Sequence, residues 1–140
     1  MKKVILGTIL TASTLFLLIG CGATTGVGVK DHNLISVFNS NMDSDKTTSI
    51  IFDMSKYCSS GLLDTEEYNL KSLNKSVIDY KIKGKPSGYY MHIEIEAIDQ
   101  SHSKVSIYNY MNTEVTKKTA QTIEKWVNGS SKTCEQGTII

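Results

Sequence analysis

The chain has 140 residues and a mass of 15.5 kDa, which is the size of a single domain with one modest core. Hydrophobic residues make up 40% and charged residues 21%, values that are typical of a folded protein and exclude an intrinsically disordered chain. The formal charge is +1 and all 15 basic residues are lysines, so nucleic-acid binding is not expected, because the arginines that contact phosphate and guanine in bidentate fashion are missing.

The first 21 residues carry the parts of a bacterial export signal in their usual order. Lys2 and Lys3 form a short positive start, and residues 4–19 are apolar over a length below the roughly 20 residues that span a bilayer. The segment ends in LIGC, residues 18–21. This motif resembles the lipobox of bacterial lipoproteins, which is a leucine and two small or apolar residues before a cysteine.

The resemblance implies that the signal peptide, residues 1–20, is cut away and that the sulfur of Cys21 is lipidated with two acyl chains. Two or more acyl chains hold a protein stably on a membrane, whereas a single chain binds only marginally. Gly22, and not an aspartate, follows the cysteine, which in a Gram-negative host implies sorting to the outer membrane on the side that faces the periplasm. We therefore expect the cell envelope as the localisation and the membrane as one partner, through the lipid anchor.

Two further cysteines, Cys58 and Cys134, remain once Cys21 carries lipid. An even pair in a compartment that permits disulfides predicts one bridge between them. The bridge would close a loop of roughly 77 residues, for which the chain-entropy account gives about 4–5 kcal/mol. A metal thiolate pair or two free thiols are the alternatives, although neither cysteine has a Cys-x-x-Cys spacing or a neighbouring histidine.

Residues 21–30 contain the lipidated cysteine and a Gly- and Thr-rich stretch without apolar periodicity, so we expect a flexible tether there and one folded domain over residues 31–140. Residues 34–38 (LISVF) fit either a short helical stripe or a strand. Residues 39–45 place oxygen side chains at alternate positions, like the start of a calcium loop, but the later glycine and glutamate of such a loop are absent. The prediction for this stretch is a polar loop that caps the next helix.

The apolar spacing predicts a helix over residues 46–59, with Ser44 or Asp45 as its N-cap and Gly61 at its end. Residues 62–74 show no clear pattern.

The apolar period then changes to two over residues 78–83, 91–97 and 105–108. The polar connections at 84–88 and 99–103 are short enough to require antiparallel neighbours. These segments therefore predict a three-stranded antiparallel meander with one apolar face.

A last helix is predicted from Asn112 or Thr113 to Gly129, with Trp126 on its apolar side. Both helices can cover the apolar face of the sheet. The prediction is an α+β fold of order α-β-β-β-α, in which helices pack on one face of a three-stranded antiparallel meander and one disulfide joins Cys58 to Cys134.

The polar face of the predicted meander carries one group of reactive side chains. It comprises His92, Glu94 and Glu96 on one strand and Tyr108 and Tyr110 on the next. Same-face residues two apart lie roughly 6.5–7 Å from each other, so the histidine and the carboxylates could share a metal or act as acid and base. Alternating charge is also typical of a solvated strand face. Because tyrosines are enriched at protein interfaces, these five residues are predicted as an interface, and no metal site is predicted.

Enzyme motifs are absent from the sequence, which has no Gly-x-Ser-x-Gly and no His-Glu-x-x-His. We therefore predict no catalytic residues and no cofactor. The expected function is that of a lipid-anchored envelope lipoprotein whose domain binds or scaffolds another envelope protein. Two alternatives stay open: a protective inhibitor or immunity lipoprotein, and a small envelope hydrolase or metal-binding protein that uses His92, Glu94 and Glu96.

Overall fold

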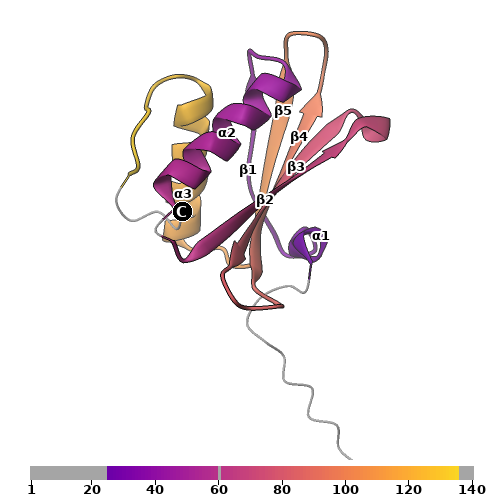
Figure 1. Cartoon of the computed structure of the whole chain (residues 1–140). Helices are drawn as coiled ribbons and strands as arrows, with labels where there is room; N and C mark the ends of the chain where they lie inside the picture. The colour runs from indigo at the N-terminus through magenta and orange to yellow at the C-terminus, as the bar shows by residue number, and fades with distance from the viewer. Residues whose placement is uncertain (1–24, 60, 136–140) are drawn as a thin grey trace, which may run out of the picture.

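The fold is a five-stranded antiparallel sheet with two long helices on one face and a single helical turn on the other (Figure 1). It is seen in a computed structural model that describes residues 25–59 and 61–135. The predicted signal peptide, residues 1–20, and the predicted lipidation site, Cys21, lie outside the described residues.

The strands follow the order β1-β5-β4-β3-β2 across the sheet, and every neighbouring pair is antiparallel. In chain order the elements are α1 (Gly26–Val29), β1 (Asn33–Ser40), α2 (Ser44–Cys58), β2 (Leu63–Leu70), the 3-10 turn η1 (Lys71–Leu73), β3 (Lys75–Ile82), β4 (Tyr89–Ala97), β5 (Ser103–Asn109) and α3 (Glu114–Val127).

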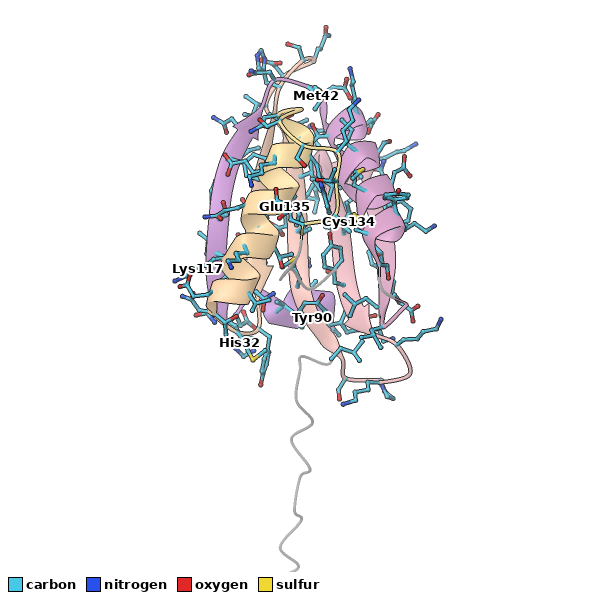
Figure 2. The ribbon with its side chains drawn as sticks, turned by 90° about the vertical axis from the view of Figure 1, so that its left-hand side faces the viewer. His32, Met42, Tyr90, Lys117, Cys134 and Glu135 are labelled. Carbon is cyan, nitrogen blue, oxygen red and sulfur yellow. A yellow bond between two sulfur atoms is a disulfide. The ribbon has the colours of Figure 1, made fainter. Side chains whose placement is uncertain are left out.

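The two long helices form where the sequence predicted them. The carboxylate of Asp43 caps α2 by accepting from the backbone N–H of Lys46 at 2.8 Å, one position before the predicted caps. Thr113 caps α3 in a reciprocal arrangement with Thr116. Figure 2 shows α2 and α3 side by side over the sheet. We call the face they cover the inner face.

The three predicted strands are confirmed as β3, β4 and β5. Their alternation puts Ile78, Ile93 and Ile107 directly opposite one another across the ladder, and all three side chains are fully buried on the inner face. Ile123 and Trp126 of α3 belong to the same core. The apolar period of two therefore predicted the centre of the sheet correctly.

The sheet has five strands and not three, so the predicted order α-β-β-β-α is wrong in this respect. The segment left open between helix and strand is β1, where a register shift between Leu34 and Ser36 breaks the alternation. The segment without a pattern contains β2, an edge strand whose side chains are mostly exposed and whose place is given by its backbone pairing to β3. Neither strand has the regular burial from which an alternating pattern arises.

The predicted disulfide is present and joins Cys58, the last residue of α2, to Cys134, beyond the end of α3, with a Cα–Cα distance of 5.3 Å (Figure 2). The indole Nε1 of Trp126 donates to the carbonyl of Thr133 at 3.0 Å and holds the segment before Cys134 against α3. The disulfide therefore joins the end of α2 to the segment that follows α3. Over the parts of the chain that the structure describes, no helix is long and apolar enough to cross a membrane.

Candidate functional site

The sheet face opposite α2 and α3, which we call the outer face, carries buried charge at its centre. Residues on this face alternate with the core residues of the same strands, as Asp79 does between Ile78 and Tyr80. We define the charged cluster as Lys30, Lys75, Asp79, His92 and Glu94. Its members come from the loop after α1, from β3 and from β4.

His92 is the centre of this cluster and is only 1% exposed. Its Nδ1 lies 2.6 Å from Oδ1 of Asp79, the residue directly opposite it on β3. This contact is a hydrogen bond between the imidazole and the carboxylate. The other ring nitrogen, Nε2, lies 3.5 Å from Oε1 of Glu94. Both nitrogens of the imidazole therefore face carboxylates.

Glu94 connects the histidine to two lysines. Lys30 Nζ donates to its Oε1 at 2.7 Å, and Lys75 Nζ donates to its Oε2 at 3.2 Å. Burial acts to raise the pKa of the Glu94 carboxyl, but the hydrogen bonds and charges of the two lysines outweigh it and bring this pKa below its ordinary value of 4.5. The hydrogen bond to Glu94 in turn raises the pKa of Lys30. Glu94 is therefore ionised and fully paired.

The helical turn α1 covers the cluster and disagrees with the predicted tether. Residues 21–30 were expected to be flexible, but Gly26–Val29 form a turn against β4 and β3, with Thr25 as its cap and Val29 buried. A Cβ atom on Gly26 would come within 1.8 Å of Oδ2 of Asp79. The close approach of backbone to carboxylate therefore requires glycine at this position.

Beside α1 the outer face contains a hollow of about 360 Å³, which we call the outer hollow. Its walls are Val27, Tyr68, Leu70, Val77 and Tyr89, together with Thr25, Gly26 and the cluster residues Asp79, His92 and Glu94. Its lining is therefore largely apolar and aromatic, with a few charged groups, a composition that is common in binding sites.

Two tyrosines at this hollow share one carboxylate. The hydroxyls of Tyr68 and Tyr89 donate to Oε2 of Glu66 at 2.6 and 2.7 Å. These hydrogen bonds, first that of Tyr68 and then that of Tyr89, lower the pKa of Glu66 and raise the pKa of each tyrosine. The rings therefore stand in fixed positions with their hydroxyls turned to Glu66.

The five residues predicted as an interface do not form one surface. His92 and Glu94 come together but are enclosed beneath α1, whereas Glu96 is exposed and pairs with Lys104 at 3.5 Å. The ring of Tyr108 lies 6.0 Å from that of His92, and Tyr110 lies beyond the end of β5. The Tyr110 ring packs on His32, which is labelled in Figure 2, with centroids 4.2 Å apart. The interface role itself stays a prediction.

Sequence reasoning missed the two residues that enclose this site, Asp79 and Lys30. Asp79 was visible as a polar residue at an alternating position of a predicted strand, but only the register of β3 against β4 puts it opposite His92. Lys30 was assigned to the tether, and no pattern in that stretch indicates that it would reach Glu94.

The cluster has the aspartate and histidine of an acid–base relay, but each ring nitrogen faces a carboxylate where a nucleophile would need to stand. Within residues 25–59 and 61–135, no group of three or more His, Cys, Asp and Glu side chains is arranged to hold a metal ion. The geometry is therefore that of a paired structural network.

In comparisons with known proteins, no family model matches this chain and no curated protein matches it.

Proposed function

We propose that this chain is a lipid-anchored lipoprotein of the bacterial envelope whose domain binds another envelope component without catalysing a reaction. The observation that carries the proposal is the LIGC motif at residues 18–21, behind a charged and apolar leader and ahead of a disulfide-bonded domain. Disulfides persist in the extracytoplasmic compartments to which such a leader directs a protein.

The charged cluster supports a binding role over a catalytic one. His92 is almost completely buried, and its ring nitrogens are directed at Asp79 and Glu94. A general base needs a free nitrogen within hydrogen-bond reach of a substrate proton. In this arrangement, the histidine links β3 to β4, and Lys30 links the end of α1 to Glu94.

A second hollow offers a surface for a protein partner. It measures about 540 Å³, lies between the loop after β1 and the end of α3, and combines apolar Phe38, Met42 and Ile50 with polar residues (Met42 is labelled in Figure 2). We call it the helical hollow. An apolar centre with a polar rim is typical of protein interfaces, and we assign the envelope partner to this surface.

Lipidation is tested by replacing Cys21 with Ser. The wild-type protein should incorporate labelled palmitate and lose residues 1–20, whereas Cys21→Ser should remain an unprocessed precursor without label. Label in the Cys21→Ser protein would contradict the lipid anchor.

Partner binding is tested with photo-crosslinking side chains at Asn41 and Lys132, both exposed residues of the helical hollow, and at Ser101 as an exposed control in the turn between β4 and β5. A defined crosslinked product should form from the first two positions and not from Ser101. A resident envelope protein in that product would support the scaffold role, and an incoming lytic enzyme would indicate an inhibitor or immunity role. Equal crosslinking from all three positions would contradict the assignment.

A further inference from the structure

We infer that the outer face of the sheet rests on the surface of the membrane to which the chain is anchored. This inference depends on the proposed function, because it takes Cys21 as the residue that carries the lipid. It adds which face of the domain meets phospholipid and which face is left for other proteins.

The length of chain between the lipid and the fold limits where the domain can lie. Thr25 caps α1 and lines the outer hollow, and Cys21 is four positions earlier. At no more than about 3.6 Å per residue, this link spans at most about 14 Å even when fully extended. The acyl chains would therefore enter the bilayer close to α1, which is itself on the outer face.

Large apolar side chains on this face are open to solvent. Val27 of α1 is 68% exposed, Val37 of β1 is 50% exposed and Leu70 of β2 is 40% exposed. Leu34 and Tyr68 add to them on the same face, as their cross-strand partners Tyr108 and Val77 show. An apolar surface of this kind beside a lipid anchor is suited to the boundary between headgroups and acyl chains.

The positions of two tyrosines also favour contact between the outer face and the membrane. Tyr68 and Tyr89 border the outer hollow with their hydroxyls bonded to Glu66. Tyrosine is enriched at membrane interfaces, because its ring is apolar while its hydroxyl can keep a polar partner.

Three carboxylates of the outer face have partners that reduce their repulsion of phospholipid, whereas the carboxylate of Glu66 accepts from the hydroxyls of Tyr68 and Tyr89. Glu94 is paired with Lys30 and Lys75, and Asp79 is paired with His92. Glu96 is paired with Lys104. Because each of these carboxylates already has a cationic or imidazole partner, they repel phosphate headgroups less than free carboxylates would.

The opposite side of the domain has the character of a water-facing surface. The exposed positions of α2 and α3 include Asp53 and Lys56 on the first helix and Glu114, Lys117 and Lys118 on the second. With the outer face on the bilayer, these helices and the helical hollow would point into the aqueous compartment. The partner surface of the proposed function would then remain accessible.

The test uses the full lipidated chain in phosphatidylcholine and phosphatidylglycerol vesicles whose acyl chains are brominated near the headgroup. Leu70→Trp and Val37→Trp place a fluorescent probe on the outer face, and Tyr57→Trp places one on α2, where the side chain is 77% exposed. The native Trp126 is buried and gives the same background in all three variants. We expect a loss of fluorescence from the two outer-face probes and unchanged intensity from Tyr57→Trp.

Two readouts separate failure of the inference from failure of the proposed function. If the protein floats with the vesicles but its outer-face probes stay bright, or Tyr57→Trp is quenched as strongly as they are, the anchor is correct and the orientation is wrong. A protein partner that normally covers this face would give bright outer-face probes in these protein-free vesicles. If the wild-type chain floats with vesicles no more than a chain that begins at Gly22 and has neither leader nor lipid, the lipid anchor is wrong, and the inference falls with it. Two independent outer-face variants guard against one that misfolds.

Discussion

The two faces of the sheet are built from the same strands, but they are stabilised in different ways. On the inner face, helices of 15 and 14 residues cover an apolar core, and a disulfide joins the end of α2 to the segment that follows α3. On the outer face, a single turn of four residues covers the ion pairs of Glu94 with two lysines and the hydrogen bond of Asp79 with His92. Alternate residues of β3 and β4 thus belong to two environments with different physics.

The two faces should respond differently to substitutions, because their residues contribute to stability in different ways. Burial of an isoleucine side chain contributes about 1.5–3 kcal/mol, so each inner-face residue adds directly to stability. A buried ion pair adds little compared with a well-packed apolar pair, but removing one partner leaves an unpaired charge and costs about 3–5 kcal/mol. Apolar burial on the inner face therefore supplies most of the stability of the fold. The paired charges of the outer face fix where α1 packs on the sheet.

Of the changes that test this comparison, removal of the disulfide should lower stability the most. Replacing both Cys58 and Cys134 with Ser should lower the free energy of unfolding by about 4–5 kcal/mol, because the crosslink limits the unfolded chain. Urea denaturation of the non-reduced proteins measures the difference. Reductant should lower the wild-type midpoint to that of the double variant and leave the double variant unchanged. Equal midpoints for the two oxidised proteins would contradict the stabilising role.

A cavity at the centre of the inner face should cause the second-largest loss of stability. Ile93→Ala removes a fully buried side chain between Ile78 and Ile107 and should cost about 4 kcal/mol. The same change at Ile98, which is 55% exposed, should stay within about 0.5 kcal/mol. Denaturant midpoints of the two variants test the contrast, and similar losses at both positions would show that the inner face is not the main source of stability.

Removing the imidazole tests the outer face. His92→Ala leaves the Asp79 carboxylate buried without its partner and should cost about 3 kcal/mol. His102→Ala removes an exposed histidine that also pairs with an aspartate, Asp99, and should change stability by less than about 0.5 kcal/mol. Thermal or urea unfolding followed by circular dichroism distinguishes them. A neutral His92→Ala would mean that the cluster is dispensable.

A local change should separate α1 from the rest of the fold. Gly26→Ala puts a methyl group where Asp79 stands, so α1 should leave the sheet while the core stays intact. The amides of α1 should lose protection from hydrogen exchange, and global stability should fall by about 1 kcal/mol. Gly61→Ala is the control for adding a methyl group in open space, although at a position with φ of +78°. Unchanged α1 protection in Gly26→Ala would contradict the close contact.

The smallest effect should be a pH dependence. Folding lowers the pKa of Glu94, so its contribution is present above the ordinary value of 4.5 and is lost as the pH falls through the lower folded value. The wild-type protein should therefore lose more stability between neutral pH and about pH 3 than Glu94→Gln does. Glu96→Gln, at an exposed pair, should behave like the wild type. Equal losses in the wild type and Glu94→Gln would contradict the paired carboxylate.

The centre of this fold could be predicted from the sequence, but its margins could not. Alternation identified β3, β4 and β5 because one side of each is fully buried, and spacing identified α2 and α3 for the same reason. The edge strand β2 has most of its side chains in solvent, and β1 has a bulge near Leu34, so neither leaves a regular pattern.

Only part of the charged cluster could be predicted from the sequence, because strand alternation places residues of one strand but not their partners on other elements. His92 and Glu94 share a strand, so their common face follows from a period of two. Asp79 and Lys30 reach them across the sheet and from α1, and such contacts depend on register and on the path of the chain. The pairing of Cys58 with Cys134 was predictable by counting, once Cys21 was assigned to lipid.

The disulfide also affects the order in which the fold can be completed. A chain that crosses a membrane from its N-terminus delivers Cys58 well before Cys134, because 76 residues separate them. Until then, the only other cysteine already delivered is Cys21. An oxidising enzyme would join these two thiols into a bridge that must later be undone. Acylation of the Cys21 sulfur would remove this wrong partner, so the lipid would protect oxidative folding as well as anchor the protein.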